Sequence, residues 1–167
     1  MITVRDAKPE DAAPLVAHLA ELAAEPGINI PLAADEIVTL DQERAMLADF
    51  AAAPRARMLV ALAEGKLVGE LSIKAISPRR AVRHVATLGM SVKQPWRRRG
   101  VGRALLTEAI AWAPKVEITR IELYVYVRNE PAIRLYEAFG FVLEGRRRNF
   151  IREGDTYLDD FVMARLL

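Results

Sequence analysis

The stretch of sequence that decides the fold begins with an apolar segment, Leu88-Gly89-Met90-Ser91-Val92, and continues through a basic turn into Gly100-Val101-Gly102-Arg103-Ala104-Leu105-Leu106. The apolar segment predicts a strand, and the spacing of apolar residues after Gly100 predicts a helix. A helix that begins here presents unpaired N–H groups and the positive end of its dipole, and both attract a phosphate. The order of strand, turn and helix therefore predicts a site for a phosphorylated ligand.

The turn between these two elements combines glycine with arginine. Gly100 and Gly102 carry no Cβ, so the backbone can approach a ligand closely there. Arginine side chains at the same place would add charge-assisted hydrogen bonds to an anion: Arg97, Arg98, Arg99 and Arg103. The dinucleotide fingerprint needs a third glycine where Leu105 stands, and no Gly-Lys-Ser/Thr follows to make a P-loop. The turn thus predicts a pyrophosphate cradle outside both of these nucleotide-binding families.

A second informative block runs from Arg120 to Phe141. It contains the sequence Asn129-Glu130-Pro131-Ala132-Ile133-Arg134-Leu135-Tyr136-Glu137-Ala138-Phe139-Gly140-Phe141. Pro131 suits the first turn of a short helix, and Gly140 suits the left-handed position after its end. The block therefore predicts a strand over Arg120–Val127 followed by a short helix.

Together the two blocks resemble the GNAT N-acetyltransferase superfamily. Arg97-x-x-Gly100-x-Gly102 is similar to the coenzyme-A signature of that family, and Val92 stands where the family's pantetheine-binding strand ends. The wider pattern from His84 to Ile133 resembles small bacterial enzymes that acetylate free amino acids. The resemblance implies a GNAT-type fold, acetyl-CoA as cosubstrate, and no metal.

The resemblance also implies roles for individual residues. Those implied to bind the cofactor are Met90, Ser91, Val92, Arg97, Arg98, Arg99, Gly100, Val101, Gly102, Arg103 and Asn129. Tyr136, seven residues after Asn129, is implied as the proton donor to the leaving thiolate, and a phenol stays protonated at neutral pH. Two structural readings stay open: Tyr136 as a packing aromatic, and Asn129 as an ordinary helix-entry residue.

Acetyl transfer from a thioester needs no protein nucleophile, so the absence of cysteine is compatible with direct attack by an amine. The general base is left open among Glu70, His84 and Glu122. Family members that acetylate ribosomal-protein N-termini carry a glutamate five residues before the motif asparagine, where this chain has Tyr124. This difference favours a small primary amine, such as a free amino acid, over a peptide.

Other functions and ligand contacts remain as alternatives. A coenzyme-A-binding sensor without catalysis, a peptide or protein N-terminal acetyltransferase, and a homodimeric assembly are left open. Trp96, Tyr124 and Tyr126 are candidates for lining an apolar or cationic substrate pocket, with sheet packing as the equal alternative.

Composition narrows the class of protein. The 167 residues predict one domain spanning 1–167, and the 24 basic and 22 acidic residues argue against nucleic acid as a partner. Zero cysteines exclude disulfides, and two histidines make a zinc site improbable. No apolar run reaches the length of a membrane span, and residues 1–6 do not resemble a signal peptide, so a cytoplasmic protein without membrane association is expected.

The remaining patterning predicts a mixed α/β (α+β) domain whose central, largely antiparallel sheet is flanked by helices. Further strands are predicted over Met1–Arg5, Met58–Ala63, Leu67–Ile76, Val85–Val92, Val142–Asn149 and Tyr157–Leu166. Further helices are predicted over Asp11–Ala24, Ala33–Ala53 and Gly100–Ala113, with a loop over Glu25–Leu32.

Overall fold

A computed structural model describes residues 1–25, 27 and 32–167. Seven strands form one sheet in the order β1-β2-β3-β4-β5-β7-β6. Every neighbouring pair is antiparallel except β4 and β5, so the predicted mixed α/β domain with a largely antiparallel sheet is confirmed.

The strands are β1 (Ile2–Asp6), β2 (Ala56–Ala63), β3 (Lys66–Ala75), β4 (Val85–Val92), β5 (Arg120–Tyr126), β6 (Val142–Glu153) and β7 (Thr156–Leu166). The α-helices are α1 (Ala12–Ala23), α2 (Leu40–Ala52), α3 (Val101–Trp112) and α4 (Glu130–Ala138).

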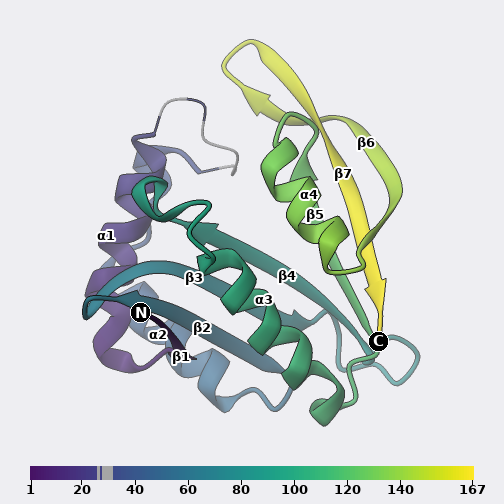
Figure 1. Cartoon of the computed structure of the whole chain (residues 1–167), viewed down its shortest axis with the longest axis horizontal. Helices are drawn as coiled ribbons and strands as arrows, with labels where there is room; N and C mark the ends of the chain where they lie inside the picture. Colours follow the sequence, from purple (N-terminus) through teal and green to yellow (C-terminus); the bar gives the residue numbers. More distant parts are fainter. Residues whose placement is uncertain (26, 28–31) are drawn as a thin grey trace.

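The helices cover the sheet on both faces. Figure 1 shows α3 lying across one face of β1 to β4, with α1 and α2 behind that part of the sheet and α4 beside β5 and β7. β4 and β5 lie together at one end of the sheet and diverge towards the other (Figure 1).

The main core lies between the sheet and α3. Strand alternation sends Leu59 and Ala61 of β2 and Leu71 and Ile73 of β3 to this face, where they meet Leu105 of α3. All five side chains are fully buried. A smaller apolar cluster lies on the opposite face, under α1 and α2: Ala12, Leu15, Leu47, Met58, Val60 and Leu67.

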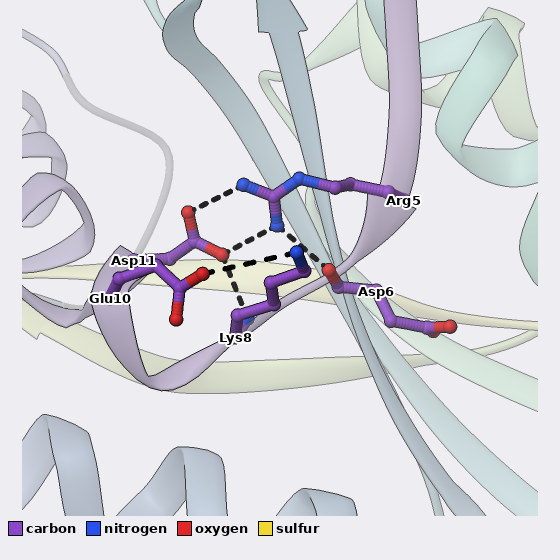
Figure 2. Close-up of polar contacts among 5 residues, drawn as sticks. All are labelled: Arg5, Asp6, Lys8, Glu10 and Asp11. Carbon is purple, nitrogen blue, oxygen red and sulfur yellow. Dashed lines mark hydrogen bonds and ion pairs between the residues drawn. The ribbon is translucent and has the colours of Figure 1, made fainter.

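An ion pair joins the end of β1 to the start of α1. Figure 2 shows the Arg5 guanidinium facing the Asp11 carboxylate, with Nη1 2.6 Å from Oδ2 and Nη2 2.8 Å from Oδ1. The backbone N–H of Lys8 also donates to Asp11 Oδ2 at 2.7 Å. These bonds hold the pKa of Asp11 below its usual range, chiefly through Arg5, and they hold the strand and the helix in a defined orientation.

The predicted helix over Ala33–Ala53 starts too early. A short 3-10 turn occupies Ala34–Glu36, and α2 begins only after Thr39. Ile37 and Val38 are β-branched and disfavour helix, whereas Thr39 caps α2 through a reciprocal pair of bonds with Gln42. The predicted loop over Glu25–Leu32 falls largely on residues 26 and 28–31, outside the described residues.

The predicted strand over Val142–Asn149 stops too soon, because β6 continues to Glu153. The register of β6 against β7 shifts between Arg147 and Ile151, and Asn149 adopts a φ of 53° within that shift. A bulge therefore allows the strand to resume beyond Asn149.

Candidate functional site

The site is built around a gap between β4 and β5. The two strands pair only from Val85 to Thr87, opposite Arg120 to Glu122, although β4 continues to Val92. The far end of β4 therefore has a backbone edge that does not pair with β5. A ligand with amide groups can add to such an edge by strand-like pairing.

The pairing of β4 with β3 shows which backbone groups face this gap. The N–H of Lys93 donates to Val68, and the N–H of Ile76 donates to Val85, so the odd-numbered residues of β4 bond to β3. Met90 and Val92 consequently direct their N–H and C=O groups towards the gap. The backbone of Ser91 faces β3 instead, although the sequence had grouped Ser91 with Met90 and Val92 as cofactor-binding.

The predicted cradle lies where β4 ends and α3 begins. Gly100 caps α3 with a φ of 89°, and Arg98 has a φ of 60°, so two left-handed residues alternate along the turn. Such alternation turns successive N–H groups into a concave anion-binding surface. Nothing lies within 4 Å of the place where a Cβ of Gly100 would stand. The turn therefore has both the donors and the space that a diphosphate needs.

The four arginines of the cradle differ in their partners. Arg97 donates from Nε to the Val92 carbonyl at 2.9 Å and pairs with Glu25 at 2.5 Å, so it supports the turn. Arg99 lies over the Trp96 ring at 5.3 Å, and Arg103 lies over the Phe139 ring at 5.4 Å. Arg98 is exposed and has no polar partner among residues 1–25, 27 and 32–167.

Gly102 was predicted to let the backbone approach a ligand closely, but the structure shows packing at this position instead. A Cβ at this position would lie 3.0 Å from Cδ2 of Leu135 and 3.3 Å from Cε of Met90. The missing side chain therefore makes room for close packing of α3 against α4 and β4. Of the two glycines in the predicted cradle, Gly100 is the one whose absent side chain leaves open space.

The two residues implied from the second block lie at opposite ends of α4. Asn129 caps the helix, because its Oδ1 accepts from the N–H of Ala132 at 3.4 Å. Tyr136 is buried, with 6% of its surface exposed, and its ring meets Phe141 edge to face at a centroid distance of 5.8 Å. Burial raises the pKa of Tyr136, and the nearby Glu70 carboxylate raises it further, so the phenol stays protonated.

A polar network lies on the other face of the sheet. Ser91 Oγ donates to Glu70 Oε1 at 2.7 Å, and His18 Nε2 lies 2.8 Å from Ser91 Oγ. The network joins α1, β3 and β4, and His18 is fully buried. Burial raises the pKa of Glu70 to about 7 and lowers the pKa of His18 to about 4.

A second carboxylate belongs to this region, and its burial was not predicted from the sequence. Glu43 of α2 is fully buried, and neither of its oxygens has a hydrogen-bond partner among the described residues. Burial raises its pKa, and its charge in turn raises the pKa of Glu70. The available signal was its spacing from Leu47 and Phe50, which places a glutamate on the apolar side of α2.

The other two candidate bases lie at the far end of the sheet. Glu122 accepts from Arg120 Nε at 2.8 Å, next to the short paired segment of β4 and β5. His84 precedes β4, and its carbonyl accepts from Thr119 and Arg120. Both therefore lie near the end of β4 that is away from the cradle.

The three aromatic residues predicted to line a substrate pocket do not lie on one face of the sheet. Tyr124 and Tyr126 alternate with the core residues Leu123 and Val125, so they lie on the face opposite α3. Trp96 packs instead against the core under α3. Tyr124 is 48% exposed, and Arg147 lies over its ring at 3.8 Å. Arg147 was missed from sequence, because its pairing with buried Asp160 depends on the β6–β7 register.

A hollow of about 600 Å³ lies away from this site. Residues from the start of β2, the end of β3 and the segment after α3 line it, including Ala56, Lys74 and Val116. This is the end of the sheet opposite the cradle. Among the described residues, no cluster of three metal-binding side chains occurs, and no helix has the length and apolarity to cross a membrane.

Comparison with known proteins agrees with this geometry. The sequence profile described as the acetyltransferase (GNAT) family matches residues 17–141. The chain is 40% identical over 115 residues to L-amino acid N-acetyltransferase AaaT of Escherichia coli (strain K12), covering 68% of this chain and 70% of that protein. It is 38% identical over 80 residues to the ribosomal protein bS18-alanine N-acetyltransferase of the same strain, covering 47% of this chain and 54% of that protein.

A solved structure matches along the whole chain. The crystal structure of the acetyltransferase of GNAT family from Streptococcus pneumoniae superposes with a TM-score of 0.92 and 32% sequence identity. The match covers 100% of this chain and 99% of that one, so the arrangement of the seven strands and four α-helices is one that the family uses.

Proposed function

Because the chain belongs to the acetyltransferase (GNAT) family, we propose that it transfers the acetyl group of acetyl-CoA to a primary amine by direct attack in a ternary complex. The observation that carries the proposal is the edge of β4 that does not pair with β5, which leads into the cradle at the start of α3. The pantetheine arm pairs with the Met90 and Val92 edge, and the diphosphate lies against the N–H groups between Arg98 and Arg103.

The chemistry needs a proton donor for the leaving thiolate. Tyr136 supplies it, because its phenol is buried and protonated, and it lies close enough to Glu70 for the charge of that carboxylate to raise the pKa of Tyr136. Asn129 orders the start of α4 and so helps to fix the direction in which Tyr136 points. The chain has no cysteine, which agrees with an amine that attacks the thioester directly.

The acceptor that we propose is a free amino acid or another small amine. The relative AaaT is named for L-amino acids, and Tyr124 stands where a peptide-acetylating enzyme would carry glutamate. Tyr124 stays half exposed beneath Arg147, on the side of the sheet that also holds Glu70. We further propose a cytoplasmic location, since a chain without cysteine has no disulfide that would need an oxidising compartment.

A thiol-release assay with acetyl-CoA tests the function. We expect turnover with free amino acids, and specificity constants measured side by side for phenylalanine, methionine, spermidine and an alanine-initiated peptide should favour an amino acid. A lead of about tenfold or more for the peptide or the polyamine would contradict the acceptor and leave acetyl transfer intact. Coenzyme-A binding without turnover of any amine would instead support a binding module.

Calorimetry with coenzyme A tests the cradle. Arg98→Glu should weaken binding by at least about tenfold, because it replaces a charge-assisted contact with repulsion at a side chain that has no polar partner in the described part of the chain. Arg80→Glu makes the same charge change in the loop before β4, at the other end of the sheet, and should leave binding unchanged. Equal effects of the two variants would show that the diphosphate binds elsewhere.

A further inference from the structure

We propose that Glu70 takes the proton from the acceptor amine, and that Ser91 and His18 hold its carboxylate in position for this transfer. The inference rests on the proposed acetyl transfer and adds a catalytic residue to it. Four observations carry the argument: the place of Glu70 in the sheet, its hydrogen bonds, its exposure and the charges around it.

Glu70 lies beside the part of β4 that faces the gap. It pairs directly with Ser91, one residue from both Met90 and Val92, whose backbones line the edge that does not pair with β5. Its side chain points to the α1 and α2 face, since its neighbour Leu71 points to α3. Tyr136 belongs to the core on the α3 side, yet it responds to the charge of Glu70. The gap between β4 and β5 therefore has a carboxylate on one side and a phenol on the other.

The hydrogen bonds leave one oxygen of Glu70 for a substrate. Oε1 accepts from Ser91, whereas Oε2 makes no hydrogen bond to any residue of the described chain. Since Ser91 Oγ donates to Glu70, it must accept from His18 Nε2, which fixes the proton of the neutral imidazole on that nitrogen. The chain of two bonds keeps the rotamer of Glu70 constant.

Exposure distinguishes Glu70 from its two buried neighbours. His18 and Glu43 are fully buried, but Glu70 is partly exposed, so it is the member of the group that a substrate can reach. An incoming ammonium group would also offset part of the negative charge of two carboxylates, Glu70 and Glu43.

Every proton in the proposed step has a donor and an acceptor. The bound ammonium gives one proton to Glu70, and the freed nitrogen lone pair forms the C–N bond as the C–S bond breaks. Tyr136 protonates the leaving thiolate. The second proton that leaves the nitrogen restores the phenol, and Glu70 releases its proton to solvent. The products are the amide, free coenzyme A and one proton.

The charges that face Glu70 come from every element around it. Ser91 of β4 donates a bond that favours the carboxylate, Glu43 of α2 opposes its ionisation, and neutral His18 comes from α1. Tyr136 of α4 stays neutral. Farther out, the pairs Lys93–Glu21 and Arg97–Glu25 each carry no net charge. Burial and these groups place the pKa of Glu70 near 7, where a base can both accept and release a proton.

The test compares Glu70→Gln with Glu122→Gln, a glutamate on β5 at the far end of the sheet. At saturating substrates Glu70→Gln should lower kcat by about 10²-fold or more, with the Kd for coenzyme A unchanged, and Glu122→Gln should have little effect. The wild-type decline of kcat below about pH 7 should vanish in Glu70→Gln. A kcat within about threefold of wild type, or a persisting decline, would overturn the inference.

Two milder variants test how the neighbours of Glu70 affect its carboxylate. They also replace Glu70→Gln as the test if that variant fails to fold. Ser91→Ala removes a bond to the carboxylate and should move the acidic limb of kcat to higher pH, whereas Glu43→Gln removes a repelling charge and should move it lower. If the acidic limb of the kcat profile stays at the same pH in both variants, the inference is overturned. A wild-type enzyme inactive towards every amine would overturn the proposed function as well, so the two failures are distinguishable.

Discussion

The two faces of the central sheet carry different kinds of buried side chain. Under α3 the buried residues are almost all aliphatic, and Leu105 and Leu106 lie fully buried between helix and sheet. Under α1 and α2 the apolar cluster is smaller, and His18, Glu43 and Glu70 lie near it. Buried ionisable groups lower stability unless they are paired. The difference indicates that the α3 face supplies most of the apolar stabilisation, whereas the α1 and α2 face carries the buried ionisable groups.

The largest effect is expected from Leu105→Ala. It should lower the free energy of unfolding by about 2–5 kcal/mol, because it opens a cavity in the main core. Urea denaturation gives the value. Leu47→Ala, in the smaller cluster on the other face, is the matched substitution and should have a smaller effect. If Leu47→Ala lowers the free energy of unfolding more than Leu105→Ala does, the α3 face does not supply most of the stability.

Tyr136→Phe should lower kcat by about 10²-fold, because it removes only the proposed proton donor. The ring and its contact with Phe141 remain, so urea denaturation should show nearly unchanged stability and the KM for acetyl-CoA should change little. An unchanged kcat, with chemistry rate-limiting, would return Tyr136 to a purely packing role on the α3 face.

Glu43→Gln should raise the free energy of unfolding by about 1 kcal/mol at pH 8, since it removes a buried charge that has no hydrogen-bond partner among the described residues. The folded-state pKa of Glu43 is raised, so the folded protein binds the proton more tightly than the unfolded chain does. Its ionisation therefore costs stability as pH rises above the ordinary glutamate pKa. The stability gain of the variant should grow between about pH 5 and pH 8 in denaturation series. A gain that shrinks as pH rises would contradict this assignment.

Asn129→Ala should lower the free energy of unfolding by only about 0.5–1 kcal/mol, because it removes a single long capping bond at the start of α4. Asn129→Asp keeps a capping oxygen and is the control. Thermal denaturation compares the two. If both variants weaken coenzyme-A binding equally while Asn129→Asp retains full stability, the amide itself contacts the cofactor.

Much of the fold was predictable because the local signals agreed. The alternating strands, Pro131 in the first turn of α4 and Gly140 with a φ of 78° after its end are local consequences of sequence. The helix that precedes β2 was predicted too long, since its alanine-rich approach has helical composition and only the Thr39 cap sets its start. The bulge at Asn149 was not predictable, because it depends on pairing with β7.

What the sequence alone determined is the order of strand, basic turn and helix around Gly100, since a left-handed glycine, a basic turn and a helix start are encoded by adjacent residues. What only the tertiary structure decided is the polar network that joins His18, Glu70 and Ser91, whose members lie up to 73 positions apart in the chain. The tertiary structure alone also decided three other features: the separation of β4 from β5, the packing role of Gly102 and the burial of Glu43. Each depends on contacts between segments distant in sequence, and the periodicity of a single segment carries no information about which distant side chain it will meet.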